Sequence, residues 1–478
     1  MSKPLNTLSL LSLKCAYNTF DLSSGLVHVS IRDQIVRATL LVRDLIESGQ
    51  PCKEILVVGA GIAGVCAAVE AARKKVRVVC VDTNDRPFKL QHVTSHRHVG
   101  PYMYEWPASL SRQQHFPPLE WPELDSVSKY FDNDFGWQAS QPMASHLLAE
   151  KLEDWLVHAR QNSMINTLTI LTSVDKDQVK NDIKAFIAAR KPLPITFKQV
   201  SEWPVAPLKD ITVTPDFILL AAGMGKEQCE LVSGVEGTKF WEDDMLWKTD
   251  VASKRVGIFG GGDGAIQDFL RAVSKYEHAL ALVEYLEQDY AVRELFEREY
   301  EYLLSIEQQN RLECTWSTNS QPIFEAFDKR VKRVSSRLAS NHCVRRRVAS
   351  ALKIRKENGR VSLYCREAYF GKAYLLNRFL AHLIDSCQFK GTDEFDDCVD
   401  FSIKFNVTAT AGAKFYNTYK ITLQSNVVGH SPQDVEFDIV SVRFGVHRDT
   451  TALRQMLGLT DADIATRTTL AGIPVPFC

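Results

Sequence analysis

The sequence predicts an α/β fold with two sheets of mostly parallel strands, a helical insertion and a mixed C-terminal region. At 54–82 a short apolar run leads directly into a glycine-rich turn, an alanine-rich helix and a second apolar run. From residue 255 the same order begins again. An apolar run too short for a helix and followed by glycine indicates a buried strand of a parallel sheet. About two hundred residues separate the two copies, which indicates paired domains and not a short repeat.

Composition excludes several classes of protein. The chain has 478 residues, enough for two or three domains, and 45% of them are hydrophobic and 24% charged. This balance argues against a disordered or collagen-like chain. The 57 basic and 58 acidic residues nearly cancel, so we expect neither a nucleic acid nor a membrane as partner. With no bilayer-spanning apolar run and no convincing cleavage site near the N-terminus, we expect a cytoplasmic protein.

The 11 cysteines are dispersed and form no CxxC pair. Cys66 and Cys80 lie in apolar runs, where a thiol behaves as a small buried hydrophobe. Since no cysteine–histidine cluster has zinc-site spacing, we expect no metal.

The first half of the chain alternates predicted helices and strands. Residues 30–48 place apolar side chains at helical spacing, and Gly49 and Pro51 end this helix. Residues 87–137 are rich in aromatic residues and proline, which indicates a long ordered excursion. In order, we also expect strands at 54–58 and 76–81, a helix at 142–160, a strand at 168–174, a helix at 177–190 and a strand at 216–220.

The second half begins with the repeated unit. In order, we expect a strand at 256–259, a turn at 260–265, a helix at 266–273, a strand at 279–283, a helix at about 370–386, and strands at 400–408, 420–423 and 437–445. The insertion at 285–356 is acidic in its first part and basic in its second. It is interpreted as two solvated helices with opposite charges facing each other; the alternative is an anion site on the basic helix.

The first glycine turn has the parts of a dinucleotide site. Gly59 permits the tight turn, Gly61 allows a pyrophosphate to approach the backbone, and Gly64 allows close packing of helix and strand. The helix N-terminus offers free N–H groups and a positive dipole end. Asp82 ends the next strand, where a carboxylate accepts hydrogen bonds from a ribose. The alternative is a purely structural glycine turn.

Residues 54–85 resemble the FAD-binding fingerprint of the two-dinucleotide-binding flavoproteins, the superfamily of pyridine nucleotide-disulfide reductases and flavin monooxygenases. The resemblance implies Rossmann-like domains, with FAD at the first turn and a nicotinamide nucleotide at the second. It also implies an adenine-passing strand ending at Val174 and a crossing turn at 221–223. The cofactor-binding residues it implies are Gly59, Gly61, Ile62, Ala63, Gly64, Asp82, Val174, Ala222 and Gly223 for FAD, and Gly260, Gly262, Asp263 and Ala265 for the nicotinamide nucleotide.

Glu284 follows the predicted strand 279–283 at the ribose position of the second unit. An acid there accepts from a free 2′-hydroxyl and repels a 2′-phosphate, so NADH is favoured over NADPH. The alternative is a degenerate nucleotide domain retained for packing.

The sequence departs from the superfamily in three places. The absence of two closely spaced cysteines excludes the disulfide reductases, and the Baeyer–Villiger signature before the second turn is also missing. The usual Gly-Asp that addresses the flavin ribityl chain is absent, with Phe444-Gly445 and Asp449 as an approximate substitute. Whether the strand at 438–444 closes the first or the second domain is therefore open.

The segment 96–107 contains the only catalytic candidates. In flavoproteins of this type the chain returns here towards the flavin, so His98, Tyr104 and Trp106 are candidates for stabilising the reduced flavin or lining a substrate pocket. The alternative is an aromatic loop that packs between domains.

We therefore expect an FAD-dependent oxidoreductase that takes hydride from NAD(P)H, with NADH favoured, and passes electrons to oxygen or a small organic substrate. The alternatives are an amine or amino-acid oxidase-like flavoprotein reduced by its substrate, and a non-catalytic FAD/NAD-binding sensor or scaffold. The partner expected is a small-molecule substrate, and a homo-oligomer is an open possibility. The regions expected are an N-terminal extension and helix at 1–50, an FAD domain at 51–250, a nicotinamide domain at 251–284 and about 357–445, the insertion at 285–356, and a closing segment at 446–478.

Overall fold

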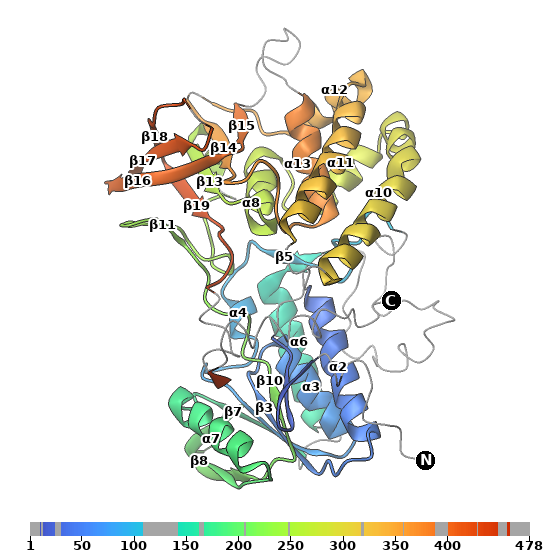
Figure 1. Cartoon of the computed structure of the whole chain (residues 1–478), viewed down its shortest axis with the longest axis vertical. Helices are drawn as coiled ribbons and strands as arrows, with labels where there is room; N and C mark the ends of the chain where they lie inside the picture. Colours follow the sequence, from blue (N-terminus) through green and yellow to red (C-terminus); the bar gives the residue numbers. More distant parts are fainter. Residues whose placement is uncertain are drawn as a thin grey trace. The chain divides into compact units, whose positions relative to one another are not determined.

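The chain forms two compact units in its computed structural model (Figure 1). The first unit comprises 1–95, 114–226 and 446–478, and the second comprises 96–113 and 227–445. The structure describes residues 10, 13–23, 30–108, 142–161, 167–204, 207–246, 249–316, 320–356, 358–387, 400–427, 429–447 and 457–458. Asp449 and most of the predicted closing segment lie outside the described residues.

The first unit is built on an eight-stranded sheet with the order β1-β2-β10-β3-β4-β7-β8-β9. The five strands from β2 to β7 run parallel, and antiparallel strands lie at both edges. β3 and β10 are buried along their whole length, as expected of a parallel sheet covered on both faces. The strands are β1 (Lys14–Ala16), β2 (Thr19–Asp21), β3 (Glu54–Val58), β4 (Arg77–Val81), β7 (Leu168–Thr172), β8 (Ile195–Glu202), β9 (Lys209–Val213) and β10 (Phe217–Leu220), with the short β6 (Met143–Ala144) apart from this sheet.

The predicted helices of the first unit are confirmed. They are α2 (Ile31–Glu47), α3 (Ile62–Arg73), α6 (Ser145–Ala159) and α7 (Lys176–Ala189), and the short α4 (Lys89–His92) is added. α2 begins with a capping box, in which Ser30 and Asp33 bond to each other's backbone N–H. α2 packs against α3, and Arg43 Nε donates to Glu70 Oε1 at 2.9 Å.

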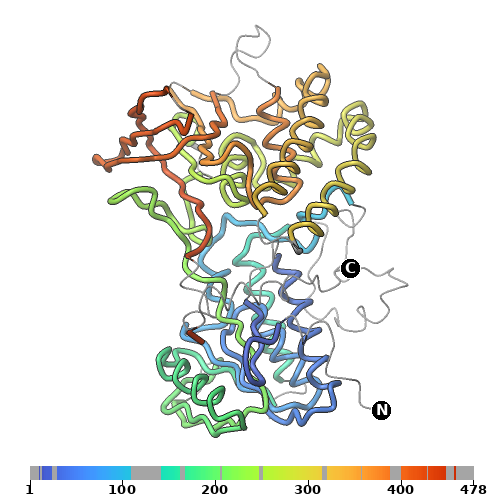
Figure 2. The backbone as a smooth tube through the Cα atoms, viewed as in Figure 1, coloured from blue at the N-terminus to red at the C-terminus, as the bar shows by residue number. Residues whose placement is uncertain are grey.

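The N-terminal strands β1 and β2 were not predicted. Each has only three residues, too few to show the period of a strand. The chain turns at Tyr17 and Asn18, and β2 then joins the sheet parallel to β10, almost two hundred residues later in the sequence. In Figure 2 the blue N-terminal chain accordingly runs beside the green segment of β10.

The second unit repeats this architecture with a four-stranded parallel sheet of order β15-β14-β13-β19. The strand predicted at 438–444 therefore belongs to the sheet of the second unit, as β19, which answers the question that the sequence left open. The strands are β13 (Arg255–Phe259), β14 (Arg360–Tyr364), β15 (Phe401–Lys404) and β19 (Ile439–Val442), with an antiparallel sheet of β16 (Val407–Phe415), β17 (Thr418–Ser425) and β18 (Gln433–Phe437), a hairpin of β11 (Glu230–Val232) and β12 (Val235–Glu236), and the short β5 (His98–Val99).

The predicted strand at 279–283 is wrong, because these residues begin helix α9. The run is apolar and short, so periodicity could not separate a strand from a buried helix. His278 caps the helix, with its Nδ1 accepting from Ala281 N–H at 3.1 Å. The helices of this unit are α8 (Asp263–Val273), α9 (Ala279–Glu287), α10 (Tyr290–Trp316), α11 (Gln321–Ala339), α12 (His342–Ala351), α13 (Leu375–Cys387) and the 3-10 helix η5 (Thr249–Ser253).

The unit boundary also differs from the predicted one at residue 250. Residues 227–250 belong to the second unit because the β11–β12 hairpin packs on β16. Residues 96–113 belong there too, since Arg97 is buried among side chains of the second unit.

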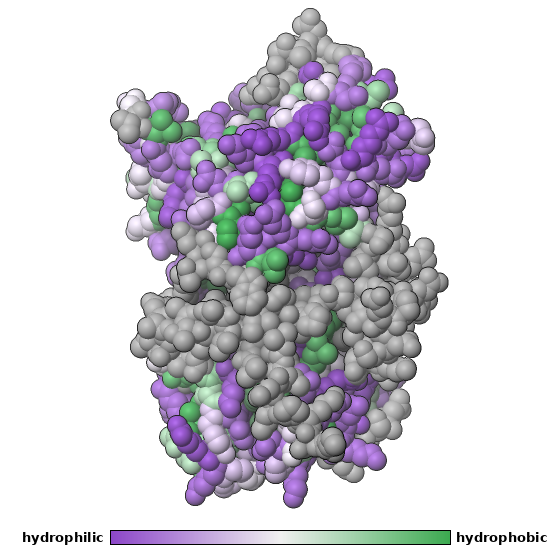
Figure 3. Space-filling model, turned by 45° about the vertical axis from the view of Figure 1, so that its right-hand side comes forward, coloured by the Kyte–Doolittle hydropathy of each residue, from purple (hydrophilic) through white to green (hydrophobic). Residues whose placement is uncertain are grey.

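The insertion is helical, and its two charged halves meet. α10 packs on α11, and Arg337 of the basic helix pairs with Glu299 of the acidic one. Figure 3 shows that much of the described surface of the second unit is hydrophilic. The contact between Arg337 and Glu299 favours the interpretation with facing charges. The predicted number of two helices is wrong, because the described residues of the insertion form three, and each of them also buries an apolar face in the core of the second unit. No helix among the described residues combines the length and apolarity that a membrane span requires.

The contact between α12 and α9 gives a stability prediction. Arg347 Nε donates to the Tyr285 carbonyl at 3.0 Å, and the guanidinium lies 3.5 Å from the centre of the Tyr285 ring. Arg347→Ala should therefore lower the free energy of unfolding by about 1–2 kcal/mol in urea denaturation. The neighbouring exposed Arg346, changed to Ala, should cost less than about 0.5 kcal/mol. Equal effects of the two changes would contradict this role for Arg347.

Candidate functional site

Two glycines of the first turn are required by the packing of the protein itself. Gly59 has φ +110°, and a Cβ there would lie 2.3 Å from the Ala221 carbonyl oxygen. A Cβ on Gly64 would lie 1.8 Å from the Gly59 carbonyl oxygen. Any larger residue at either position would push α3 away from the end of the sheet.

Gly61 is different, because nothing in the fold requires a glycine there. Its φ of −74° is open to every residue, and an added Cβ would have no atom within 4 Å. Gly61 caps α3, whose first N–H, that of Ile62, has no hydrogen-bond partner among the described residues. The turn therefore leaves open space at a helix N-terminus, where N–H groups and the helix dipole favour an anion.

Asp82 lies beside this turn, as predicted. Its Oδ2 accepts from Ala60 N–H at 2.5 Å, and its Oδ1 accepts from Asn84 N–H at 2.7 Å. An ionised carboxylate has about four acceptor positions, so further hydroxyl donors can still be bound. Val174 N–H donates to the Asp82 carbonyl at 3.0 Å, which places the end of β7 at the same site.

The turn after β10 completes this edge. Ala221 N–H donates to the Val58 carbonyl at 2.7 Å, and Gly223 has φ +80° with no atom within 4 Å of an added Cβ. The structure thus brings the predicted FAD residues together at the carboxyl edge of one parallel sheet, where α/β proteins bind ligands. They are Gly59, Gly61, Ile62, Ala63, Gly64, Asp82, Val174, Ala222 and Gly223.

The second turn repeats the backbone geometry of the first. Gly260 N–H donates to the Tyr364 carbonyl at 2.9 Å, just as Gly59 N–H donates to the Val81 carbonyl at 2.7 Å. Cys365 therefore stands where Asp82 stands in the first unit. Burial raises the pKa of the Cys365 thiol, which is 0% exposed.

The assignment of Glu284 to the ribose position is therefore wrong. Glu284 lies within α9, since the second strand of this unit is β14 and not residues 279–283. Burial, with the nearby Glu287 carboxylate, raises the pKa of Glu284. The reason for preferring NADH over NADPH is removed with this assignment.

The second turn is filled by the chain itself. Residues 369–374, here called the strap, cross it after β14, and Gly371 N–H donates to the Gly261 carbonyl at 2.7 Å. Asp263 N–H, the counterpart of Ile62 N–H, donates to the Lys372 carbonyl at 2.9 Å. A Cβ on Gly262 would lie 3.3 Å from that same oxygen. The Lys372 carbonyl thus occupies the acceptor position that a phosphate would take.

The strap is firmly held. The Asp263 carboxylate accepts from Tyr374 N–H at 3.1 Å and from Asn377 Nδ2 at 2.7 Å. Burial raises the pKa of Asp263, although these hydrogen bonds act in the opposite direction. Arg378, which is 0% exposed, donates to the Phe370 carbonyl at 2.7 Å and pairs with Asp328 at 2.5 Å. Asp263 therefore holds the strap on the turn, next to Gly260, Gly262 and Ala265.

The three catalytic candidates make packing contacts within the second unit. Tyr104 stacks on Tyr374 with ring centres 4.1 Å apart, and its hydroxyl accepts from Gln267 Nε2 at 2.8 Å. The Trp106 indole N–H donates to Glu287 at 2.8 Å. His98 Nε2 lies 3.1 Å from Glu277 Oε2, and the centre of the His98 ring is 5.2 Å from that of the His278 ring. These contacts favour the alternative of an aromatic packing segment.

The histidine pair gives a pH prediction. Burial, with the charge of His98, lowers the pKa of His278 to about 3. The unfolded chain takes up a proton near pH 6.5 and the folded chain does not, so stability is lost as the pH falls below about 6.5. His278→Asn keeps an N-cap acceptor without this titration, and its stability relative to the wild type should rise by about 2 kcal/mol between pH 7 and pH 5.

Urea denaturation at a series of pH values measures this difference. A curve for His278→Asn that runs parallel to that of the wild type would refute the assignment.

One family model matches a part of the chain. Residues 57–120 match the family described as NAD(P)-binding Rossmann-like domain. No curated protein matches the chain. One similar solved structure is bacillithiol disulfide reductase from Staphylococcus aureus, with 10% sequence identity and a TM-score of 0.36; the match covers 83% of this chain and 77% of that one. Another is thioredoxin reductase from Lactococcus lactis, with 10% identity and a TM-score of 0.36; the match covers 88% of this chain and 95% of that one.

Ornithine N-hydroxylase from Kutzneria sp. 744 is also similar (10% identity, 88% of this chain, 98% of that chain, TM-score 0.32). At this level of identity and TM-score, the similarity defines no activity for the present chain. Residues 57–120 match the family described as NAD(P)-binding Rossmann-like domain, and each of the two units of the described chain has a parallel sheet in which one strand leads through a glycine turn into a helix.

Proposed function

We propose that the chain is an FAD-dependent oxidoreductase whose first unit holds the dinucleotide. One observation carries this proposal: Gly61 is a glycine that neither its φ nor its protein neighbours require, at an open helix N-terminus. A ligand that must approach the backbone closely explains why a side chain is absent. The flavin, when bound, supplies the hydride and electron chemistry.

The chain's own residues bind and orient this cofactor. The N–H groups at the start of α3 face the phosphates, and Asp82 accepts from ribose hydroxyls. The backbone around Gly223 lies at the same edge of the sheet and offers room beside the turn.

The proposal includes NAD(P)H as hydride donor, with oxygen or a small organic substrate as acceptor. The second Rossmann-like unit supports a nicotinamide nucleotide, provided that the strap leaves its turn. The filled turn specifically favours a second candidate, in which an organic substrate such as an amine or amino acid reduces the flavin directly. The chain would then use its second unit for packing alone.

A matched pair of glycine variants tests the binding site. Gly61→Val should fold like the wild type, since its Cβ meets no atom, but should lose FAD and purify colourless. Gly262→Val should keep the flavin and instead lose stability, because its Cβ meets the Lys372 carbonyl at 3.3 Å. Visible absorbance and thermal unfolding measure the two effects. Full flavin occupancy in Gly61→Val would refute the site.

Anaerobic titration separates the two candidates. If NAD(P)H is the donor, NADH or NADPH bleaches the visible absorbance of the flavin. If the strap stays on the turn, neither nucleotide bleaches it. Amines and amino acids are then added to the same sample, and bleaching by one of them supports the second candidate.

A further inference from the structure

Arg37 is a buried cation without a hydrogen-bond partner. Its residue is 0% exposed, and Nε, Nη1 and Nη2 all lack a partner in the described part of the chain. The equally buried Arg378 bonds to a carboxylate and to backbone carbonyls. Leaving a buried guanidinium unbonded is costly, so a missing acceptor is the simplest physical explanation for Arg37.

The topology places Arg37 near the first glycine turn. Asp21 of β2 and Val58 of β3 both pair with Leu220 of β10. Asp21, the last residue of β2, therefore lies at the same height along the sheet as Val58, the residue before Gly59. α2 follows β2 as α3 follows β3, so both helices begin at the carboxyl edge of the sheet. Asp21 and Asp33 are the charged groups that act on Arg37.

The helix pairing fixes the depth of Arg37. Arg43 is level with Glu70, because the two side chains bond. Arg37 lies six residues nearer the start of α2, which is about 9 Å along the helix axis. Six residues before Glu70 on the neighbouring helix α3 is Gly64, in the first turn of that helix. Arg37 therefore lies at about the height of Gly64. Helical side chains lean towards the N-terminus, which directs Arg37 towards the phosphate end of α3.

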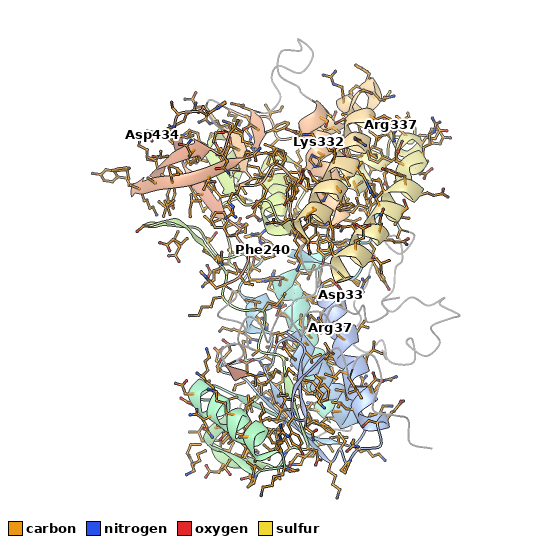
Figure 4. All side chains as sticks on the ribbon, viewed as in Figure 1. Asp33, Arg37, Phe240, Lys332, Arg337 and Asp434 are labelled. Atoms are coloured by element: carbon orange, nitrogen blue, oxygen red, sulfur yellow. The ribbon has the colours of Figure 1, made fainter. Side chains whose placement is uncertain are left out.

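The neighbouring carboxylates do not bond to Arg37. Asp33 belongs to the capping box, where its Oδ2 accepts from Ser30 N–H at 2.9 Å, and it also pairs with Arg32 at 3.2 Å. Asp21 Oδ1 accepts from Ser23 N–H at 2.8 Å. Figure 4 labels Asp33 and Arg37, which lie one turn apart on α2. The two carboxylates supply nearby negative charge and leave the guanidinium donors for another acceptor.

We infer that Arg37 binds the pyrophosphate of the dinucleotide held at the first glycine turn. The inference rests on the proposed function. The planar guanidinium donates through a fork that matches phosphate oxygens, and it completes from α2 a site that α3 begins. The N-terminal segment then has a specific purpose in the site: β2 extends the sheet by one strand and α2 delivers a cation to its carboxyl edge.

Arg37→Met tests the inference through two effects of opposite sign. It should weaken the binding of FAD and of ADP at least tenfold, while adenosine, which lacks phosphate, binds unchanged. In flavin-stripped protein it should leave the thermal midpoint equal to or above that of the wild type, because an unpartnered buried charge is removed. Arg378→Met, which breaks a partnered buried arginine, should lower the midpoint and serves as control.

The outcomes separate the inference from the proposed function. If the wild type binds neither FAD nor ADP in calorimetry, the proposed function fails and the inference with it. If the wild type binds both and Arg37→Met binds them equally well, the inference alone is overturned. A lowered midpoint with unchanged affinity would likewise assign Arg37 a structural role. Should Arg37→Met fail to fold, Arg37→Lys takes its place, because lysine keeps the positive charge but lacks the two parallel N–H donors of the guanidinium. Unchanged affinity for ADP in Arg37→Lys would overturn the inference.

Discussion

The first unit depends on the close approach of backbone to backbone at its glycine turn. Gly59 lies against the Ala221 carbonyl, and Gly64 lies against Gly59 itself. These contacts leave no room for a Cβ, so they fix the angle at which α3 leaves the sheet. The start of α3, the end of β4 and the turn after β10 meet at one edge as a consequence. Everything that we propose about a dinucleotide depends on this convergence.

The two glycine turns have the same backbone geometry, but only the first has free space at the start of its helix. Both turns donate from their first glycine to the strand beside them, and in both the chain returns across the turn through a hydrogen bond to the residue after that glycine, from Phe88 in one and Gly371 in the other. In the second unit the residue after Gly371 makes a further hydrogen bond: the Lys372 carbonyl accepts from Asp263 N–H at the start of α8. The described residues of the first unit show no matching bond from the residue after Phe88 to the start of α3. A carbonyl oxygen satisfies the helix N-terminus as an anion would. Occupation of that acceptor position is thus the difference between the open turn and the filled one.

A buried charge network ties the segment 96–107 to the second unit. Arg97 pairs with Asp244 and Asp268, and Arg271 and Arg443 complete the cluster. Burial raises the pKa of Asp268, but the three guanidinium groups outweigh it and the net shift is downward. Such a network fixes where the segment packs, since moving Arg97 away would take one cation from each of the buried carboxylates Asp244 and Asp268. The aromatic residues that follow Arg97 are thereby placed against α8, α9 and α13 as core.

The sequence by itself predicted the glycine turn of the first unit and the strands and helix around it, because those signals are local. The glycine spacing, the apolar run before it and Asp82 after the next strand lie within 30 residues, and each reflects a backbone need that chain neighbours decide. The helices at 30–48 and 142–160 were equally readable from their periodicity. What only the tertiary structure decided came from pairing across long separations. The short run at 279–283 is a helix because β14, over 70 residues later, takes the place beside β13. The strap fills the second turn, and β2 brings Asp21 and α2 to the first one, through contacts that no local pattern encodes.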